Sequence, residues 1–227
     1  MSSTGVAGMN RRAFLHFTAA TAVMAAVGPN RAAAASDANP VALPPPQLDS
    51  GRPLMQVVQA RRSARAFAPK PLPPQVLANL LWAGDGVNRP DTGGRTAPTA
   101  SNSQDVDIYI AMADGLFLYD AKAHALQTIQ GEDIRALTGK QAYVKEAPVN
   151  LIYVSDLAKM KAAREDREMY AAAHTGFISQ NVYLYCASEG LATVVRASID
   201  RPVLAQKMGL RSTQKIILAQ SVGYPKA

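Results

Sequence analysis

Three arginines and a serine fall within five positions in the segment RRSARAF. They are Arg61, Arg62, Ser63 and Arg65, and no acidic residue lies between Arg61 and Lys70. Guanidinium groups and a hydroxyl match the oxygens of a phosphate in charge and in hydrogen-bonding geometry, so the segment could bind a phosphate. Basic side chains also occur at solvated helix ends, where they complement the negative pole of the helix dipole. The segment alone therefore indicates an anion site but leaves the ordinary helix end open.

Other chemistry has little support in the sequence. Beyond the N-terminal extension the histidines are His124 and His174, and their spacing from each other and from Cys186 matches no common metal motif. The chain lacks G-x-S-x-G, although a triad assembled in space stays open. Cys186 lies in an apolar helical segment, so we expect a small buried residue rather than a nucleophile. The glycine-rich stretch GDGVNRPDTGG is neither a P-loop nor a dinucleotide fingerprint. When side chains offer no evident acid, base or nucleophile, a cofactor often supplies the reactivity.

Helices and strands must position these residues. Their sequence patterns are mixed along the chain without strict βαβ alternation, which indicates an α+β fold. The expected helices run from a cap at Asp49 or Ser50 into the arginine segment, over 73–84, from about Lys161 to Glu189, and over 200–209. The expected strands lie at 107–113, 116–120, 147–156, 191–199 and 215–225. Residues 84–104 show no apolar period, and so long a loop is usually functional or disordered.

Length and composition fit a globular chain. The 227 residues suffice for one domain with a substantial core, or for two small ones. A single cysteine cannot form an internal disulfide. The chain has a net charge of +7. Three of these positive charges belong to Arg11, Arg12 and Arg31 in an N-terminal extension without acidic residues, which leaves +4 for the remainder. A mildly basic chain without a stripe of basic and aromatic residues is not expected to bind nucleic acid.

Residues 1–35 have the pattern of an export signal. Arg11 and Arg12 precede Phe14 and Leu15, and a short apolar stretch ends in small residues suited to cleavage. This arrangement is similar to a bacterial Tat signal, and the apolar stretch is too short for a membrane-spanning helix. We therefore expect the Tat export machinery as a partner, a periplasmic or otherwise exported location, and no stable membrane insertion. A disordered alanine-rich tail is the alternative, in which case the protein would be cytoplasmic.

Four segments follow one another along the remaining chain. They are RRSARAF after the first helix, the turn and strand of GRTAPTASNSQDVDIYIA, the helix, glycine and strand of GFISQNVYLYCASEGLATVVRASID, and GYPK. This ordered set resembles the nitroreductase family of FMN-dependent oxidoreductases over nearly all of residues 50–226. The resemblance implies a mixed, mainly antiparallel sheet flanked by helices, with FMN at a homodimer interface. The chain then divides into a Tat-type signal peptide (1–35), a Pro-rich arm (36–48) and an FMN-binding domain (49–227).

The resemblance implies FMN contacts for three sets of residues. The FMN phosphate and ribityl chain would be bound by Arg61, Arg62, Ser63 and Arg65. The family's P-S-S-x-N-x-Q segment, which wraps the flavin and typically comes from the partner subunit, is similar to Pro98, Thr99, Ala100, Ser101, Asn102 and Gln104. The strand after the helix-stopping glycine would lay its backbone along the ring edge at Val195, Arg196 and Ala197. No residue is assigned as a covalent catalyst or a metal ligand.

The implied reaction is a two-electron ping-pong transfer between a small-molecule reductant and an organic acceptor such as a nitroaromatic or a quinone, or dehydrogenation of a small substrate. NAD(P)H is the usual donor in the family but is not expected in quantity outside the cytoplasm, so the donor stays open. A flavin-binding protein without turnover, and a periplasmic interaction protein that kept only the fold, are the alternatives.

Arg196 and the C-terminus depart from the family pattern. Many relatives carry glycine or an acidic residue at the strand edge, where this chain has Arg196, and Lys226 is the only basic residue after G-Y-P. In an apolar strand the charge of Arg196 must be paired, for instance with Asp200, or solvated, or bound to a ligand. If it faced the flavin, it would favour the reduced form and could attract an anionic substrate.

Overall fold

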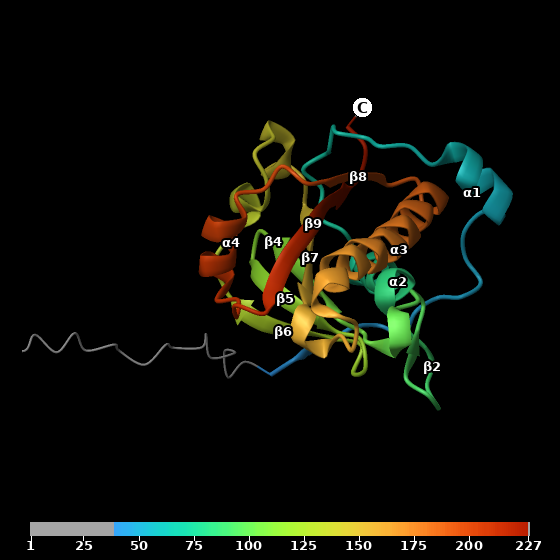
Figure 1. The fold of residues 1–227 in the computed structure, drawn as a ribbon. Coiled ribbons are helices and arrows are strands. Elements are labelled where there is room, and N and C mark those ends of the chain that lie inside the picture. The colour runs from blue at the N-terminus through green and yellow to red at the C-terminus, as the bar shows by residue number, and fades with distance from the viewer. Residues whose placement is uncertain (1–38, 227) are drawn as a thin grey trace, which may run out of the picture. The chain divides into compact units, whose positions relative to one another are not determined.

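The computed structural model describes residues 39–226, and these residues fold around one large sheet (Figure 1). The strands are β1 (Val41–Ala42), β2 (Val87–Arg89), β3 (Gly94–Arg95), β4 (Val106–Met112), β5 (Gly115–Asp120), β6 (Ala125–Gln130), β7 (Val149–Asp156), β8 (Ala192–Arg196) and β9 (Gln214–Gly223). The helices are α1 (Leu54–Ala60), α2 (Pro74–Asp85), α3 (Arg167–Ser188) and α4 (Arg201–Met208). Short 3-10 turns are η1 (Ala100–Asn102), η2 (Arg135–Thr138), η3 (Ala142–Val144), η4 (Leu157–Lys159) and η5 (Arg164–Asp166).

The sheet has seven strands in the order β1-β6-β5-β4-β7-β9-β8, and each neighbouring pair is antiparallel. Strands β2 and β3 form a separate hairpin. Strand β8 is therefore an edge strand within the described residues, and its outer side has no strand beside it. The predicted α+β fold, with a mainly antiparallel sheet flanked by helices, is confirmed.

Apolar side chains on both faces of the sheet hold the helices in place. On one face, Leu80 of α2 and Ile178 of α3 pack against Tyr153 of β7. On the other face, Leu204 of α4 packs in a cluster with Ile152 of β7. Because β7 lies inside the sheet, between β4 and β9, its residues contribute to both cores, and all eight are buried. Helix α3, which carries several residues of the candidate site, is thus fixed to the sheet along its length (Figure 1).

Helix α4 and the end of α2 follow the sequence signals closely. Asp200 caps α4 by accepting a hydrogen bond from the N–H of Val203 at 3.3 Å, and Gly209 ends the helix with a left-handed φ of 66°. Helix α2 has Pro74 at its first position, as predicted, and extends one residue beyond Gly84 before Gly86 ends it.

The predicted starts of α1 and α3 were wrong. Pro53 is the N-cap of α1, and no side chain caps it. A residue before proline is disfavoured in the helical region, so Arg52 and the residues preceding it cannot begin the helix. Helix α3 begins at Arg167 rather than near Lys161, because 157–166 form η4 and η5 with extended backbone between them.

Four strands, β1, β2, β3 and β6, were not predicted, and the first three are only two or three residues long. The expected loop 84–104 contains the β2–β3 hairpin and η1, and the Pro-rich arm contributes β1, which pairs with the unpredicted strand β6. Strands of two or three residues, most of them exposed, carry no apolar period that a sequence could reveal. The pairing of β1 also depends on a partner distant in the chain, because Val41 pairs with Leu126.

Candidate functional site

The arginine segment leaves the end of α1 in an extended conformation and lies beside β8. Arg61 is the C-cap of α1. The N–H of Ala64 donates to the carbonyl of Thr193 at 2.9 Å, which fixes the segment to the sheet edge. The polar side chains of this segment that are exposed are those of Arg62, Ser63 and Arg65, whereas Arg61 is half-buried.

Tyr183 of α3 joins the arginine segment to the strand edge. Its hydroxyl lies 2.8 Å from the Ser63 hydroxyl and accepts a hydrogen bond from the N–H of Val195 at 2.9 Å. The guanidinium of Arg61 lies over the Tyr183 ring, 5.2 Å from its centre, which is a cation–π contact. The sequence had not singled out Tyr183, because an aromatic residue at helical spacing looks like ordinary core.

The cations of the arginine segment are not neutralised by acidic groups. In the part of the chain that the structure describes, no ion pair or side-chain hydrogen bond engages Arg62 or Arg65. Uncompensated, exposed guanidinium groups on a segment fixed by backbone hydrogen bonds suit an anion such as a phosphate. The arrangement therefore favours the anion site over the ordinary helix end.

A free backbone donor stands at the end of β8, close to this segment in the fold. The N–H of Val195 is engaged by Tyr183, whereas Ala197 is exposed and its N–H has no hydrogen-bond partner among residues 39–226. Such a donor can bind an electron-rich ring edge. Of the three predicted edge residues, Ala197 is thus the one whose backbone is open to a ligand.

The side chain of Arg196 points into the protein rather than into solvent. Arg196 is 5% exposed, and its guanidinium donates to the carbonyl and hydroxyl of Thr138, to Asn150 Oδ1 at 2.8 Å and to Ser221 Oγ at 3.4 Å. Burial lowers the pKa of Arg196 to about 10, so the group stays charged at neutral pH. The suggested pairing with Asp200 was wrong, because Asp200 caps α4 and the charge of Arg196 is held by neutral groups.

A segment that the sequence did not indicate lies at the same end of β8. The N–H of Lys140 donates to the carbonyl of Ser198 at 3.1 Å. Next to it, the side-chain oxygen of Gln141 is buried without a hydrogen-bond partner in the described residues. An unpaired buried acceptor is costly, and a bound ligand with a donor group could satisfy it.

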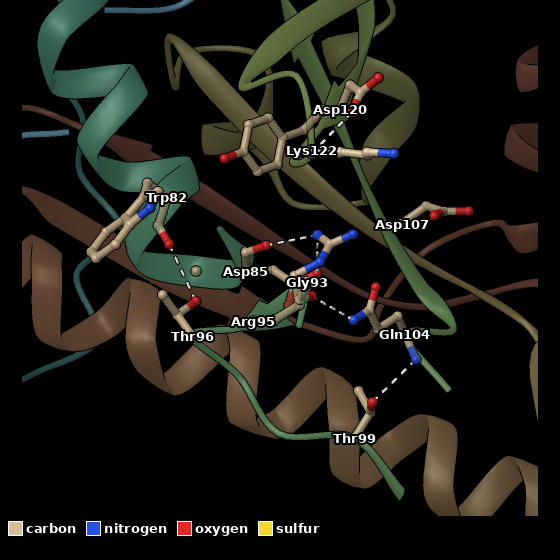
Figure 2. Close-up of polar contacts among 12 residues, drawn as sticks. Trp82, Asp85, Gly93, Arg95, Thr96, Thr99, Gln104, Asp107, Asp120 and Lys122 are labelled. Atoms are coloured by element: carbon tan, nitrogen blue, oxygen red, sulfur yellow. Dashed lines mark hydrogen bonds and ion pairs between the residues drawn. The ribbon is translucent and has the colours of Figure 1, made fainter. Parts of the chain in front are cut away.

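The predicted flavin loop, Pro98–Gln104, has an unusual backbone. Ser101, Asn102 and Gln104 have φ values of 53°, 50° and 44°, which non-glycine residues seldom adopt. Gln104 holds the loop together, because its N–H donates to Thr99 Oγ1 at 3.1 Å and its amide donates to the carbonyl of Gly93 at 2.9 Å (Figure 2). Backbone strain of this kind often occurs at ligand-binding sites.

The flavin loop and the arginine segment lie at different positions along α3. The loop is bonded to His174, and the arginine segment is bonded to Tyr183, nine residues later. At 1.5 Å per residue these anchors are about 13 Å apart along the helix. One chain therefore brings the arginine segment and β8 together but keeps the loop apart from them.

The GYPK segment lies beside the arginine segment. The N–H of Ala68 donates to the carbonyl of Tyr224 at 2.9 Å, and the N–H of Lys226 donates to that of Ala66 at 3.3 Å. The ammonium group of Lys70 lies 4.4 Å from the centre of the Tyr224 ring. Lys226 is thus exposed and joined through its backbone to the arginine segment, and it also lines the cavity near β1.

Asp85 and Arg95 connect α2 to the hairpin that supports the flavin loop (Figure 2). The guanidinium of Arg95 donates to Asp85 Oδ2 at 3.3 Å and to the Asp85 carbonyl at 2.9 Å. Asp85 is only 4% exposed, and this burial raises the pKa of its carboxyl group to about 7. The positive charge of Arg95 acts in the opposite direction but does not cancel the shift. Asp85 therefore titrates near neutral pH.

Asp85→Asn is expected to change how stability depends on pH. Folded protein holds a proton on Asp85 that the unfolded chain releases above pH 3.8, so the wild-type free energy of unfolding should fall from about pH 4 to pH 7 and then level off. The variant lacks this dependence. Its free energy of unfolding, relative to that of wild type, should therefore rise by up to about 1.4 kcal/mol for each pH unit over that range. Urea titrations at pH 5 and pH 7 measure the gain. Asp91→Asn, on the same hairpin but exposed, is the control, and equal profiles for the two variants would contradict the assignment.

A separate cavity of about 840 Å³ opens near β1 and the start of α2. Its walls are largely apolar and include Leu77, Met112 and Phe117. None of the predicted FMN-binding residues lines it. Ala100 and Ser101 of the flavin loop instead line a smaller pocket of about 160 Å³ beside His174.

Other sequence expectations can be compared with the described residues. Cys186 is fully buried, as predicted, and burial raises the pKa of its thiol well above the usual range. In 39–226 no group of three or more His, Cys, Asp or Glu side chains is placed to hold a metal ion. No helix in that range is long and apolar enough to cross a membrane. The predicted signal peptide, residues 1–35, lies outside the described residues.

Comparison with known proteins identifies relatives. A protein of Methanocaldococcus jannaschii named as a nitroreductase, MJ1384, is 31% identical over 152 residues, covering 62% of this chain and 76% of that protein. A crystal structure from Ralstonia eutropha JMP134, also named as a nitroreductase, has a TM-score of 0.80 at 39% identity and covers 88% of this chain and 93% of its own. A structure from Desulfovibrio desulfuricans, named as a nitroreductase in complex with FMN, has a TM-score of 0.58 at 20% identity over 78% of this chain and 89% of its own, and shows the shared fold. The model of the nitroreductase family matches residues 58–224, and this chain therefore belongs to the nitroreductase family.

Proposed function

We propose that this chain is an FMN-dependent oxidoreductase that moves two electrons between a small-molecule reductant and an organic acceptor such as a nitroaromatic or a quinone, or that dehydrogenates a small substrate. The observation that carries the proposal is the exposed arginine segment, whose cations have no acidic partner in the described residues, beside the free N–H of Ala197. Family membership and the relative solved with FMN support the choice of cofactor.

The chain's own groups fit this cofactor. When bound, FMN supplies the two-electron chemistry. Arg61, Arg62 and Arg65 would hold its phosphate, together with the Ser63 hydroxyl that Tyr183 orients. The N–H of Ala197 would donate to the ring edge, and the buried oxygen of Gln141 could accept a hydrogen bond from it. Binding and orientation, rather than a covalent residue, would be the contribution of the protein.

The site is proposed to need two chains. In one chain the flavin loop and the arginine segment lie apart along α3, so a loop from a partner subunit would complete the site. Large apolar side chains are exposed on α1 and α3, as expected of a surface that a second copy covers. They are Leu54 (63% exposed), Met55 (76%), Val58 (50%), Met169 (57%) and Phe177 (48%).

Phe177→Lys is expected to give a monomer that retains little FMN. A charge on the apolar surface of α3 opposes its burial against a second copy, and FMN would then lose the partner's loop. Light scattering with absorbance detection measures both mass and bound flavin. Val203→Lys is the control, since Val203 is similarly exposed (49%) but lies on α4. A Phe177→Lys dimer that keeps its FMN would contradict the two-chain site.

Turnover tests the proposed activity. Holoprotein reduced with dithionite under anaerobic conditions should be reoxidised rapidly by a quinone or a nitroaromatic, followed by its visible absorbance. Reoxidation no faster than that of free FMN would instead indicate a flavin-binding protein without turnover.

We also propose export in folded form, supported by the Arg11–Arg12 pattern alone, with an electron donor that need not be NAD(P)H.

A further inference from the structure

The flavin loop requires an anchor, because three of its residues have left-handed backbone. Ser101, Asn102 and Gln104 would relax toward ordinary conformations unless their surroundings held them. Four of the loop's hydrogen bonds are internal: the N–H of Gln104 donates to Thr99 and its amide to Asn102, and two further bonds join backbone groups. Another reaches the β2–β3 hairpin at Gly93. These contacts stay within the loop and the adjoining hairpin, and none of them reaches the main sheet or α3.

His174 supplies the connection to the core. The N–H of Ala100 donates to His174 Nε2 at 2.8 Å, and His174 is 2% exposed on α3. A backbone N–H can only donate, so Nε2 must be the unprotonated nitrogen of the ring and Nδ1 must carry the hydrogen. The ring of Tyr170 stacks on His174 with centres 5.9 Å apart and restricts its orientation.

Asp105 fixes this tautomer from the other side of the ring. His174 Nδ1 lies 2.6 Å from Asp105 Oδ1, and Asp105 is fully buried. Two serine hydroxyls also donate to the carboxyl group, from Ser155 of β7 at 2.7 Å and from Ser103 of the loop at 2.8 Å. The carboxyl group is therefore held by the sheet and in turn holds both the histidine and the loop.

We propose that the buried Asp105–His174 pair positions the flavin loop, with His174 as a positioning residue that presents Pro98–Gln104 in its ligand-binding conformation. The inference rests on the proposed function of this loop in binding FMN. The pair itself does not contact the cofactor. It transmits the rigidity of β7 and α3 to the backbone at Ala100, so that the loop's conformational entropy is lost before the ligand binds.

Two variants of His174 test the proposal. Phenylalanine fills the same space but accepts no hydrogen bond, whereas the amide of glutamine can accept from Ala100 and donate to Asp105 with similar spacing. His174→Phe should weaken FMN binding to the apoprotein by roughly tenfold or more, since a buried donor loses its partner. His174→Gln should restore part of the affinity. Amide hydrogen exchange of the loop in the apoprotein should be faster in His174→Phe than in wild type, and intermediate in His174→Gln.

His124→Gln is the matched control, because His124 also bridges two groups, Tyr119 and the carbonyl of Pro44, but lies away from the loop. It should leave FMN affinity and loop exchange unchanged. Wild-type FMN affinity and loop exchange in His174→Phe would overturn the proposal, even if its melting temperature fell. If His174→Phe does not fold, wild-type affinity and loop exchange in Asp105→Asn would overturn it instead. A wild-type chain that binds no FMN would fail at the earlier step, by contradicting the proposed function.

Discussion

Arg61→Ala and Arg65→Ala should each weaken FMN binding by roughly ten- to a hundredfold, which corresponds to the loss of a charge-assisted phosphate contact worth about 1.5–3 kcal/mol. The stability of the apoprotein should barely change for Arg65→Ala, because its guanidinium has no partner in the described residues. Arg61→Ala should cost slightly more stability, because it also loses the contact with the ring of Tyr183. Titration of apoprotein with FMN, followed by flavin fluorescence, measures the affinity.

Arg164→Ala is the control for these variants. Arg164 is an exposed arginine without hydrogen-bond or ion-pair partners in the described range, and it lies in η5, away from the arginine segment. Its removal changes net charge by the same amount and should leave FMN affinity unaltered. Equal affinities for Arg65→Ala and wild type would remove the phosphate assignment, and equal losses in all three variants would attribute the effect to net charge alone.

Arg196→Met should lower both the stability of the protein and the midpoint potential of bound FMN. The substitution leaves buried oxygens of Thr138 and Asn150 without their guanidinium donor, which should cost about 1–3 kcal/mol of unfolding free energy. It also removes a buried positive charge that no carboxylate compensates. Because reduction brings negative charge to the cofactor, loss of this cation at the end of β8 should lower the potential by on the order of tens of millivolts.

Arg196→Lys separates the charge from the hydrogen bonds. Lysine keeps the cation but cannot reach all the groups that the guanidinium binds, so it should lose stability and keep a potential near that of wild type. Redox titration with reference dyes and thermal melts measure the two effects. An unchanged potential in Arg196→Met, with a lowered melting temperature, would make Arg196 a structural residue only.

The parts of the site that were predictable follow local sequence rules. The arginine segment was identifiable because three cations without nearby acids are conspicuous in a short stretch, whereas its placement beside β8 is a finding of the fold. Helix α4 was predictable because Asp200 and Gly209 are local signals for its two ends. Sequence rules of this kind act over a few residues and need no knowledge of the fold.

The parts that were not predictable depend on contacts between distant residues. Tyr183 looked like a core residue of α3, and only the fold brings its hydroxyl to Ser63 and Val195. The pairing of Asp105 with His174 spans 69 positions in the chain. The environment of Arg196 is assembled from β7, β9 and η2, so the sequence could not decide among a paired, a solvated and a ligand-bound guanidinium.

The FMN content of the purified protein tests the central claim most directly. Full-length protein, purified without added flavin and then denatured, should release FMN, identified by chromatography and quantified by absorbance against protein concentration. If each site is built from two chains as proposed, a dimer should contain close to one FMN for each chain. Apoprotein should return to the same ratio of FMN to chain when FMN is added. Protein that is colourless as purified and does not bind added FMN would contradict the proposed cofactor and the function built on it.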